Sequence, residues 1–138
     1  DTGTATMTPV GIFMGCFYTD PGTNQPTFNQ TYPASTAADD IMAYVLDDPD
    51  CVFRMQSDEA LAQTTLGNNV GVVQTAGSTS IGRSKNAVDG STAATTNTLP
   101  LRILEFVDGP DSEVGDAFTD VLLTYNAGMH LYRNATGV

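Results

Sequence analysis

The sequence predicts a mainly β protein, a small antiparallel β-barrel or sandwich with one short helix. Charged residues make up only 15% of the chain, and 20 threonines accompany a single lysine, Lys85. Threonine is β-branched and favours strands, whereas helix surfaces usually carry Lys, Glu and Arg. Short apolar runs are also separated by turn signals, and no long amphipathic helix is visible.

The length of 138 residues fits one domain. We expect an arm or connector over residues 1–8 and a single β-rich domain over residues 9–138, with long loops at 20–38 and 77–98. A chain of this size buries roughly two thirds of its unfolded surface, which is enough for one core. Because the chain begins at Asp1 without methionine, we expect an upstream segment to be missing or removed.

The first half of the chain predicts three strands. Residues 9–18 (PVGIFMGCFY) form a continuous apolar run typical of a buried strand. Residues 41–46 (IMAYVL) and 51–56 (CVFRMQ) flank the turn signal DDPD, which predicts a hairpin or a tight β-corner between them. The long polar loop 20–38 contains Phe28 and Tyr32. These two aromatic residues are the candidate interface, the alternative being that both rings pack on their own core.

The second half predicts one short helix and further strands. Ser57 resembles an N-cap, and Asp58 and Glu59 would occupy the first turn of a helix that ends at Gly67. Residues 77–98 are small and polar, which predicts an exposed loop or a weak strand pair. The remaining segments are predicted as strands at 70–75, 99–107 and 117–126, a turn at 108–116, and a short closing strand at 129–132.

The charge balance excludes two classes of partner. The net charge is −11, and the five cations are scattered along the chain. A nucleic-acid-binding protein needs clustered cations, so we predict no nucleic-acid partner. An anionic membrane surface is disfavoured for the same reason, and no apolar run reaches the roughly 20 residues that span a bilayer. We therefore predict no membrane partner either.

No catalytic, cofactor or metal site is predicted. His130 is the only histidine, in the apolar context GMHLY, and no Gly-x-Ser-x-Gly motif accompanies it; a packed or surface histidine is the simpler interpretation. Cys16, Cys51 and one histidine make no zinc pattern. Each cysteine lies in an apolar stretch, so buried free thiols are preferred to a disulfide.

Two acidic turns leave calcium binding open as an alternative. One turn carries Asp47, Asp48 and Asp50, and the other spans residues 108–116 with four acidic side chains. Calcium takes six to eight oxygen ligands, but neither turn has the spacing of an EF-hand. Aspartate also stabilises ordinary turns by binding its own backbone, which is the preferred interpretation.

Several segments resemble the head decoration, or cement, proteins of tailed bacteriophages, notably marine ones. The resemblance lies in PVGIFMGCFYTDPGTNQPTFNQTYPAST (9–36) and DIMAYVLDDPDCVFRMQSD (40–58), and LRILEFVD (101–108), VGDAFTDVLLTYNAG (114–128) and the terminal ATGV continue it. The most distinctive pieces are GC-x-YTDP and AYV-x-DDP. Members of this family begin with an aromatic- and proline-rich segment near FGFRPV, which is absent here, so the resemblance implies a truncated or processed start.

The resemblance implies a non-enzymatic virion protein that binds the outer surface of the assembled capsid and stabilises it. It further implies the major capsid protein as partner, a homo-oligomer (dimer or trimer), and no cofactor. A secreted or surface binding module, adhesin-like or carbohydrate-binding and calcium-dependent through the acidic turns, is the competing hypothesis. The two hypotheses differ in their dependence on calcium and in the state of Cys16 and Cys51.

Overall fold

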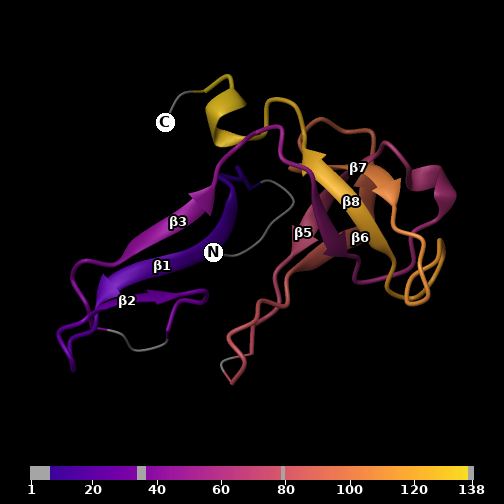
Figure 1. Cartoon of the computed structure of the whole chain (residues 1–138). Helices are drawn as coiled ribbons and strands as arrows, with labels where there is room; N and C mark the ends of the chain where they lie inside the picture. Colours follow the sequence, from indigo (N-terminus) through magenta and orange to yellow (C-terminus); the bar gives the residue numbers. More distant parts are fainter. Residues whose placement is uncertain (1–6, 34–36, 79, 137–138) are drawn as a thin grey trace.

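The computed structural model describes residues 7–33, 37–78 and 80–136, which form two antiparallel sheets on opposite sides of the molecule (Figure 1). The three-stranded sheet has the order β2-β1-β3, and the five-stranded sheet has the order β4-β8-β7-β5-β6. The mainly β fold is confirmed. The strands are β1 (Ile12–Thr19), β2 (Pro26–Asn29), β3 (Met42–Leu46), β4 (Phe53–Gln56), β5 (Asn69–Val73), β6 (Ala87–Ala94), β7 (Leu101–Phe106) and β8 (Asp120–Tyr125).

The hydrophobic core belongs to the five-stranded sheet. Val70, Val88, Ile103, Val121 and Leu123 are each fully buried, and they lie on four of its five strands. Alternate residues of a strand point to opposite faces, so these strands supply one continuous apolar face. The full cluster is Leu61, Val70, Val72, Val88, Leu101, Ile103, Phe106, Val121, Leu123 and Tyr125.

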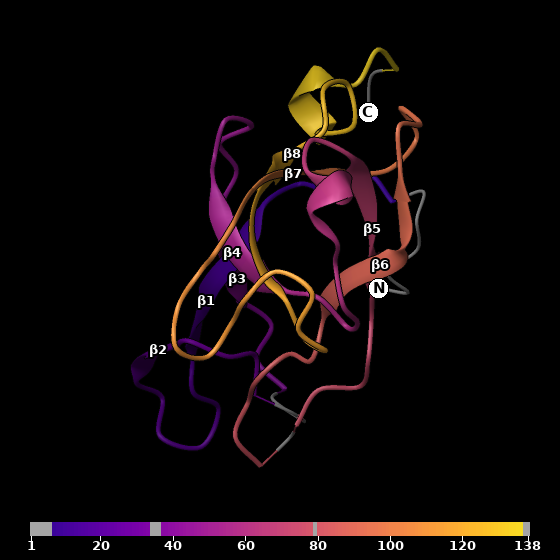
Figure 2. The same cartoon turned by 90° about the vertical axis from the view of Figure 1, so that its right-hand side faces the viewer.

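The five-stranded sheet curls until its two edge strands meet. The residue after β4, Ser57, forms a parallel bridge with Val88 of β6, and the Asp58 N–H donates to the Val88 carbonyl at 3.0 Å. Figure 2 shows the curved sheet from its own side of the molecule. This single bridge does not close a barrel, so of the two predicted architectures the barrel is not formed.

The predicted helix after Ser57 is wrong. The only helical turn between residues 57 and 67 is the 3₁₀ segment η1 (Gln63–Thr65). The backbone before it bonds to other elements: the Ser57 N–H donates to the Thr119 carbonyl at 2.8 Å, and the Leu61 N–H donates to the Thr119 hydroxyl at 3.1 Å. In a helix capped by Ser57, the Leu61 N–H would donate to the Ser57 carbonyl, so its bond to Thr119 replaces the first helical hydrogen bond.

Both segments predicted as long loops contain a strand. In the 77–98 segment, for which a weak strand pair is the predicted alternative, β6 forms and pairs with β5, and its Val88 is fully buried. The 20–38 segment contains β2, which pairs with β1, while residues 34–36 lie outside the described part. Small polar residues hide both strands from a reading of hydrophobic periodicity.

Two further segments differ from one of their predicted forms. Of the two connections predicted between 41–46 and 51–56, the hairpin is not formed, since β3 pairs with β1 and β4 pairs with β8. The turn between them passes from one sheet to the other, so the β-corner is the predicted connection that fits. The closing strand at 129–132 is instead the 3₁₀ segment η2 (Leu131–Arg133). Of the predicted arm, residues 1–6 lie outside the described part, and Met7 packs against the core cluster.

A glycine bulge shapes β1. The register between β1 and β3 shifts between Phe13 and Gly15, and Gly15 has a φ of 141°. A β-carbon built there would lie 2.7 Å from the ring of Phe28 and 2.7 Å from the carbonyl oxygen of Asn29. Glycine is therefore required at this position both by its backbone angle and by the ring that lies over it.

The core assignment predicts a contrast between adjacent residues of β7. Replacing Ile103, which is fully buried, with alanine (Ile103→Ala) should cost about 2–5 kcal/mol of unfolding free energy, because a cavity is added to the lost apolar burial. Leu104 is 43% exposed, so the variant Leu104→Ala should lose less than about 1 kcal/mol of unfolding free energy. Urea unfolding of both variants measures the difference, and equal losses would contradict the core assignment.

Candidate functional site: an apolar sheet face and an acidic cluster

The three-stranded sheet exposes large hydrophobic side chains instead of burying them. Every residue of β3 is exposed, and the exposed fractions are 61% for Met42, 49% for Tyr44 and 43% for Leu46. Single exposed hydrophobic residues are common on protein surfaces, but a run along one strand is not. The sequence correctly indicates an apolar strand at this position, but it gives no sign that the strand is exposed.

Four of the exposed hydrophobic side chains share one face of the sheet. Antiparallel partners lie on the same face, and Phe17 is paired with both Phe28 of β2 and Met42 of β3. The rings of Phe28 and Tyr44 lie 5.9 Å apart between centroids. Met42, Tyr44 and Leu46 alternate along β3, so they point the same way. We call Phe28, Met42, Tyr44 and Leu46 the apolar sheet face.

The opposite face of the sheet is covered only along the C-terminal half of β1. Cys16 is fully buried and Tyr18 is 4% exposed. The Asn29 amide donates to the Tyr18 hydroxyl at 2.7 Å, and the Cys16 thiol contacts the carbonyl of Thr31 at 3.6 Å. Cys16 and Cys51 are both free thiols, as the sequence predicts, although Cys51 is only partly buried. Towards the other end of the sheet, Phe13 and its partner Val45 lie on this opposite face and are 45% and 40% exposed.

The two predicted interface residues lie on or near this sheet. Phe28, at 54% exposure, belongs to the apolar sheet face, and Tyr32, at 60% exposure, follows β2. Neither ring folds back into the core, which was the alternative. Whether they contact a partner remains a prediction. Met42, Tyr44 and Leu46 were not singled out as interface residues, because an apolar hexapeptide normally signals burial.

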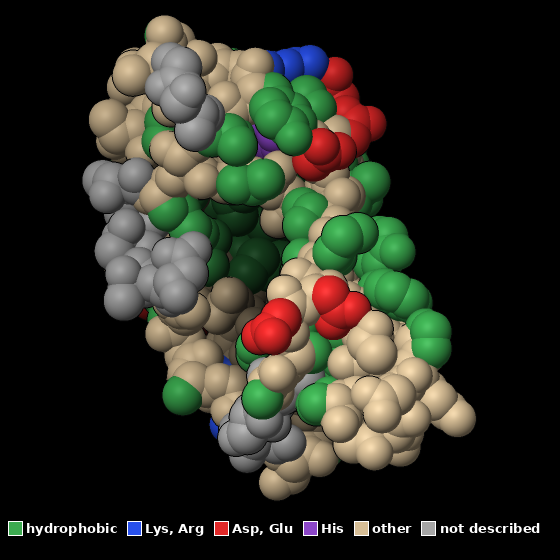
Figure 3. All heavy atoms as spheres, turned by 90° about the vertical axis from the view of Figure 1, so that its left-hand side faces the viewer, with side chains coloured by type: hydrophobic (Ala, Val, Ile, Leu, Met, Phe, Trp, Pro, Cys, Tyr) green, Lys and Arg blue, Asp and Glu red, His purple; other side chains and the backbone are tan. Residues whose placement is uncertain are grey.

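Acidic side chains flank both ends of β3. Asp39 and Asp40 precede the strand, and Asp47, Asp48 and Asp50 follow it; all five are exposed. Figure 3 shows two groups of acidic side chains with hydrophobic side chains between and beside them. β3 is thus an exposed apolar strand with acidic residues at both ends.

Several of these carboxylates have defined partners. The Asp40 carboxylate accepts from the Thr19 hydroxyl at 2.6 Å and from the Thr19 N–H at 3.0 Å, and these bonds lower the pKa of Asp40. The Tyr132 hydroxyl donates to Asp47 at 2.8 Å, which raises the pKa of Tyr132. Arg133 pairs with Asp50 at 2.6 Å. These contacts position the chain at each end of β3.

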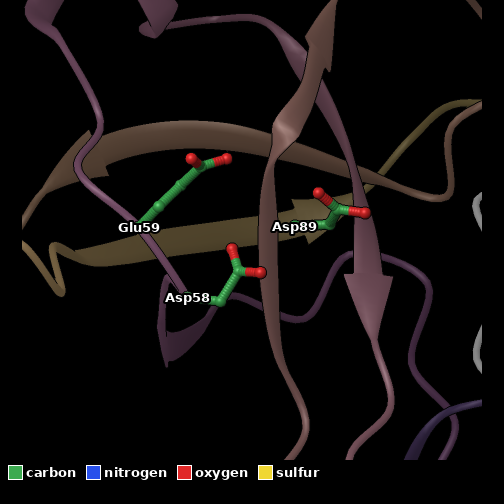
Figure 4. Close-up of side chains that lie close together, drawn as sticks. All are labelled: Asp58, Glu59 and Asp89. Atoms are coloured by element: carbon green, nitrogen blue, oxygen red, sulfur yellow. The ribbon is translucent and has the colours of Figure 1, made fainter.

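A separate acidic cluster lies beside the five-stranded sheet. Carboxylate oxygens of Asp58, Glu59 and Asp89 all lie within 4.8 Å of one another, and Figure 4 shows the three side chains. Asp58 accepts from the Gly90 N–H at 3.1 Å, and Asp89 accepts from the Ser91 hydroxyl at 2.6 Å. The Ser57–Val88 bridge brings the two segments together, so sequence spacing could not reveal this cluster.

The two turns considered for calcium do not form such a cluster. Among the described residues, Asp58, Glu59 and Asp89 are the only group of three or more acidic, histidine or cysteine side chains brought within 4.8 Å. In the first turn, Asp48 accepts from the Asp50 N–H at 2.9 Å. In the second, Asp116 accepts from the Glu113 N–H at 2.8 Å. Both contacts are the ordinary bonds of aspartate-rich turns.

His130 is packed inside the molecule. It is 1% exposed, and its ring lies edge-on to Tyr125 at 4.8 Å and to Tyr132 at 5.4 Å between centroids. Its Nδ1 accepts from the Tyr132 N–H at 3.2 Å, which leaves the proton of the neutral ring on Nε2. Burial of the neighbouring Tyr125 raises the pKa of that phenol to about 12. His130 thus has the packed role that the sequence favours.

Comparison of this chain with protein-family models, curated proteins and solved structures found no match. Within the described residues, no helical segment has the length and apolar character needed to cross a bilayer.

The Asp40 contact predicts a local acid transition. Because the pKa of Asp40 in the folded chain lies below its ordinary value of 3.8, its bonds to Thr19 stabilise the fold above that pH and are lost as the pH falls through the lower folded value. The Thr19 amide resonance should therefore shift with a midpoint below 3.8 in an NMR pH titration.

The variant Asp40→Asn provides the control for this titration. It should abolish the shift at Thr19 but keep the separate shift of the Gly22 amide, which donates to Asp20 at 2.8 Å. A Thr19 shift that persists in the variant would assign the transition to another carboxylate.

Proposed function

We propose that this chain is a structural virion protein, a capsid decoration or cement protein, that binds the outer surface of an assembled bacteriophage capsid and stabilises it without enzymatic activity. The observation that supports this proposal most directly is the apolar sheet face. A chain with a net charge of −11 is well suited to stay soluble, yet it leaves Phe28, Met42, Tyr44 and Leu46 in water. A partner that covers them would gain about 25 cal/mol for each Å² of apolar surface removed from water.

The arrangement of the two sheets suits a protein that reinforces a lattice. The five-stranded sheet holds its own core, so the three-stranded sheet is available for contacts with neighbours. The major capsid protein is the proposed partner, and dimers or trimers of this chain are the proposed assembly. A strongly acidic surface suits the outside of the shell, because it is repelled by packaged DNA and by other particles.

The test is co-sedimentation with capsids. The purified chain is mixed with undecorated expanded shells of the phage that encodes it, and with unexpanded shells. We expect saturable binding to expanded shells at a fixed copy number per lattice position. Absence of binding by the folded chain to either form would refute the proposal.

A matched pair of variants tests the surface that carries the binding. Leu46 and Leu104 are both 43% exposed, and Leu46 belongs to the apolar sheet face whereas Leu104 lies on β7. We expect Leu46→Thr to weaken shell binding about threefold to thirtyfold, the effect of losing one well-placed apolar contact. Leu104→Thr should bind like the unaltered chain. Equal effects would exclude the apolar sheet face as the contact.

The competing hypothesis is a calcium-dependent surface binding module, and the specific observation in its favour is the cluster of Asp58, Glu59 and Asp89. It predicts that millimolar calcium raises the melting temperature of the chain relative to EDTA, and that Glu59→Gln removes this rise. The capsid proposal predicts equal shell binding in calcium and in EDTA. Thermal melts and co-sedimentation in both buffers separate the two.

A further inference from the structure

Within residues 7–33, 37–78 and 80–136, no strand pairs with the outer edge of β3. In the three-stranded sheet β3 pairs only with β1, and all five residues of β3 are exposed. In an antiparallel sheet, alternate residues of an edge strand direct their N–H and carbonyl groups away from the sheet. β3 therefore offers a row of backbone donors and acceptors next to the apolar sheet face, which is the combination that an added strand uses.

Charge decides which strand can occupy this edge. If a second copy paired antiparallel with β3 about Tyr44, Met42 would face Leu46 and Asp40 would face Asp48. Acidic residues would then meet acidic residues at both ends of the pair, which disfavours the pairing. A strand with basic residues at both ends would meet opposite charges at both ends instead.

We propose that the open edge of β3 binds an extended segment of a partner protein that has an apolar centre and basic residues at both ends, by adding it as a fourth strand. The backbone edge provides the hydrogen bonds. Alternate apolar side chains of the incoming strand lie beside those of β3 on the apolar sheet face. Asp39 and Asp40 at one end, with Asp47 and Asp48 at the other, select its basic ends, whereas Asp50 already pairs with Arg133. This inference deepens the proposed function. It rests on that function only in assigning the bound segment to the capsid subunit.

Peptides of defined chemistry test the edge directly. The probe is a short synthetic peptide with alternating valine and threonine and with lysines at both ends. One control has the same centre and glutamates at both ends, and a second has proline in place of the central valine. In NMR titrations of the whole chain, we expect shifts and slowed amide exchange along β3 with the lysine peptide only.

Three results would overturn the inference. One is equal binding of the lysine and glutamate peptides. Another is shifts confined to residues outside the three-stranded sheet, or no shifts at all. The third is protection of β3 amides that grows with protein concentration without peptide, which would make a second copy the occupant.

Isosteric variants test the charge selection. The double variant Asp39→Asn, Asp48→Asn removes one charge from each end of β3, and asparagine at 48 can still accept the Asp50 N–H. We expect it to bind the lysine peptide about twofold to tenfold more weakly, with a smaller dependence on salt. The control Asp108→Asn, Asp111→Asn changes the net charge equally in a turn that precedes β8, and it should not alter binding.

The same variants separate this inference from the proposed function. If expanded shells bind the unaltered chain and the Asp39, Asp48 variant equally well, the capsid function stands and the inference about the β3 edge fails. If the lysine peptide pairs with β3 but shells do not bind, the edge has the proposed specificity and the capsid function fails.

Discussion

The fold depends on the meeting of the two edges of the five-stranded sheet at Ser57 and Val88. Thr119 holds this junction together: its carbonyl accepts from the Ser57 N–H at 2.8 Å and its hydroxyl accepts from the Leu61 N–H at 3.1 Å. Both Thr119 and Ser57 are almost completely buried, so these bonds are protected from water. The junction folds the sheet around its core, and Gly90 permits the close approach, because a β-carbon there would lie 2.7 Å from Glu59 Cγ.

This arrangement concentrates stability in one sheet. The three-stranded sheet is buried around Cys16 and Tyr18, and two exposed polar contacts join the turn after β3 to the C-terminal segment. Tyr132 bonds to Asp47, and Arg133 pairs with Asp50. An exposed ion pair of this kind contributes at most about 1 kcal/mol. The apolar sheet face is therefore not part of the hydrophobic core.

The candidate surface and the acidic cluster illustrate different limits of sequence reasoning. Phe28 was identifiable as an aromatic residue in a polar segment, and it does lie on the exposed face. Met42, Tyr44 and Leu46 were read correctly as a strand, but their exposure follows from the lack of any covering layer, which no local pattern encodes. The cluster of Asp58, Glu59 and Asp89 combines residues that are distant in sequence, so it exists only through the Ser57–Val88 bridge.

Local patterns determined the β class, the turns rich in aspartate, and the strands with strong apolar runs such as those at β1, β3, β7 and β8. Composition also determined the strong acidity and the scattered cations. The tertiary structure decided that residues 57–61 are not helical, that β2 and β6 exist within polar segments, and that β3 and β4 belong to different sheets. The physical reason is common to all three. Backbone donors bind the acceptors that the fold brings near them. The edge of an existing strand also pairs with segments of small polar residues, in which no hydrophobic periodicity predicts a strand.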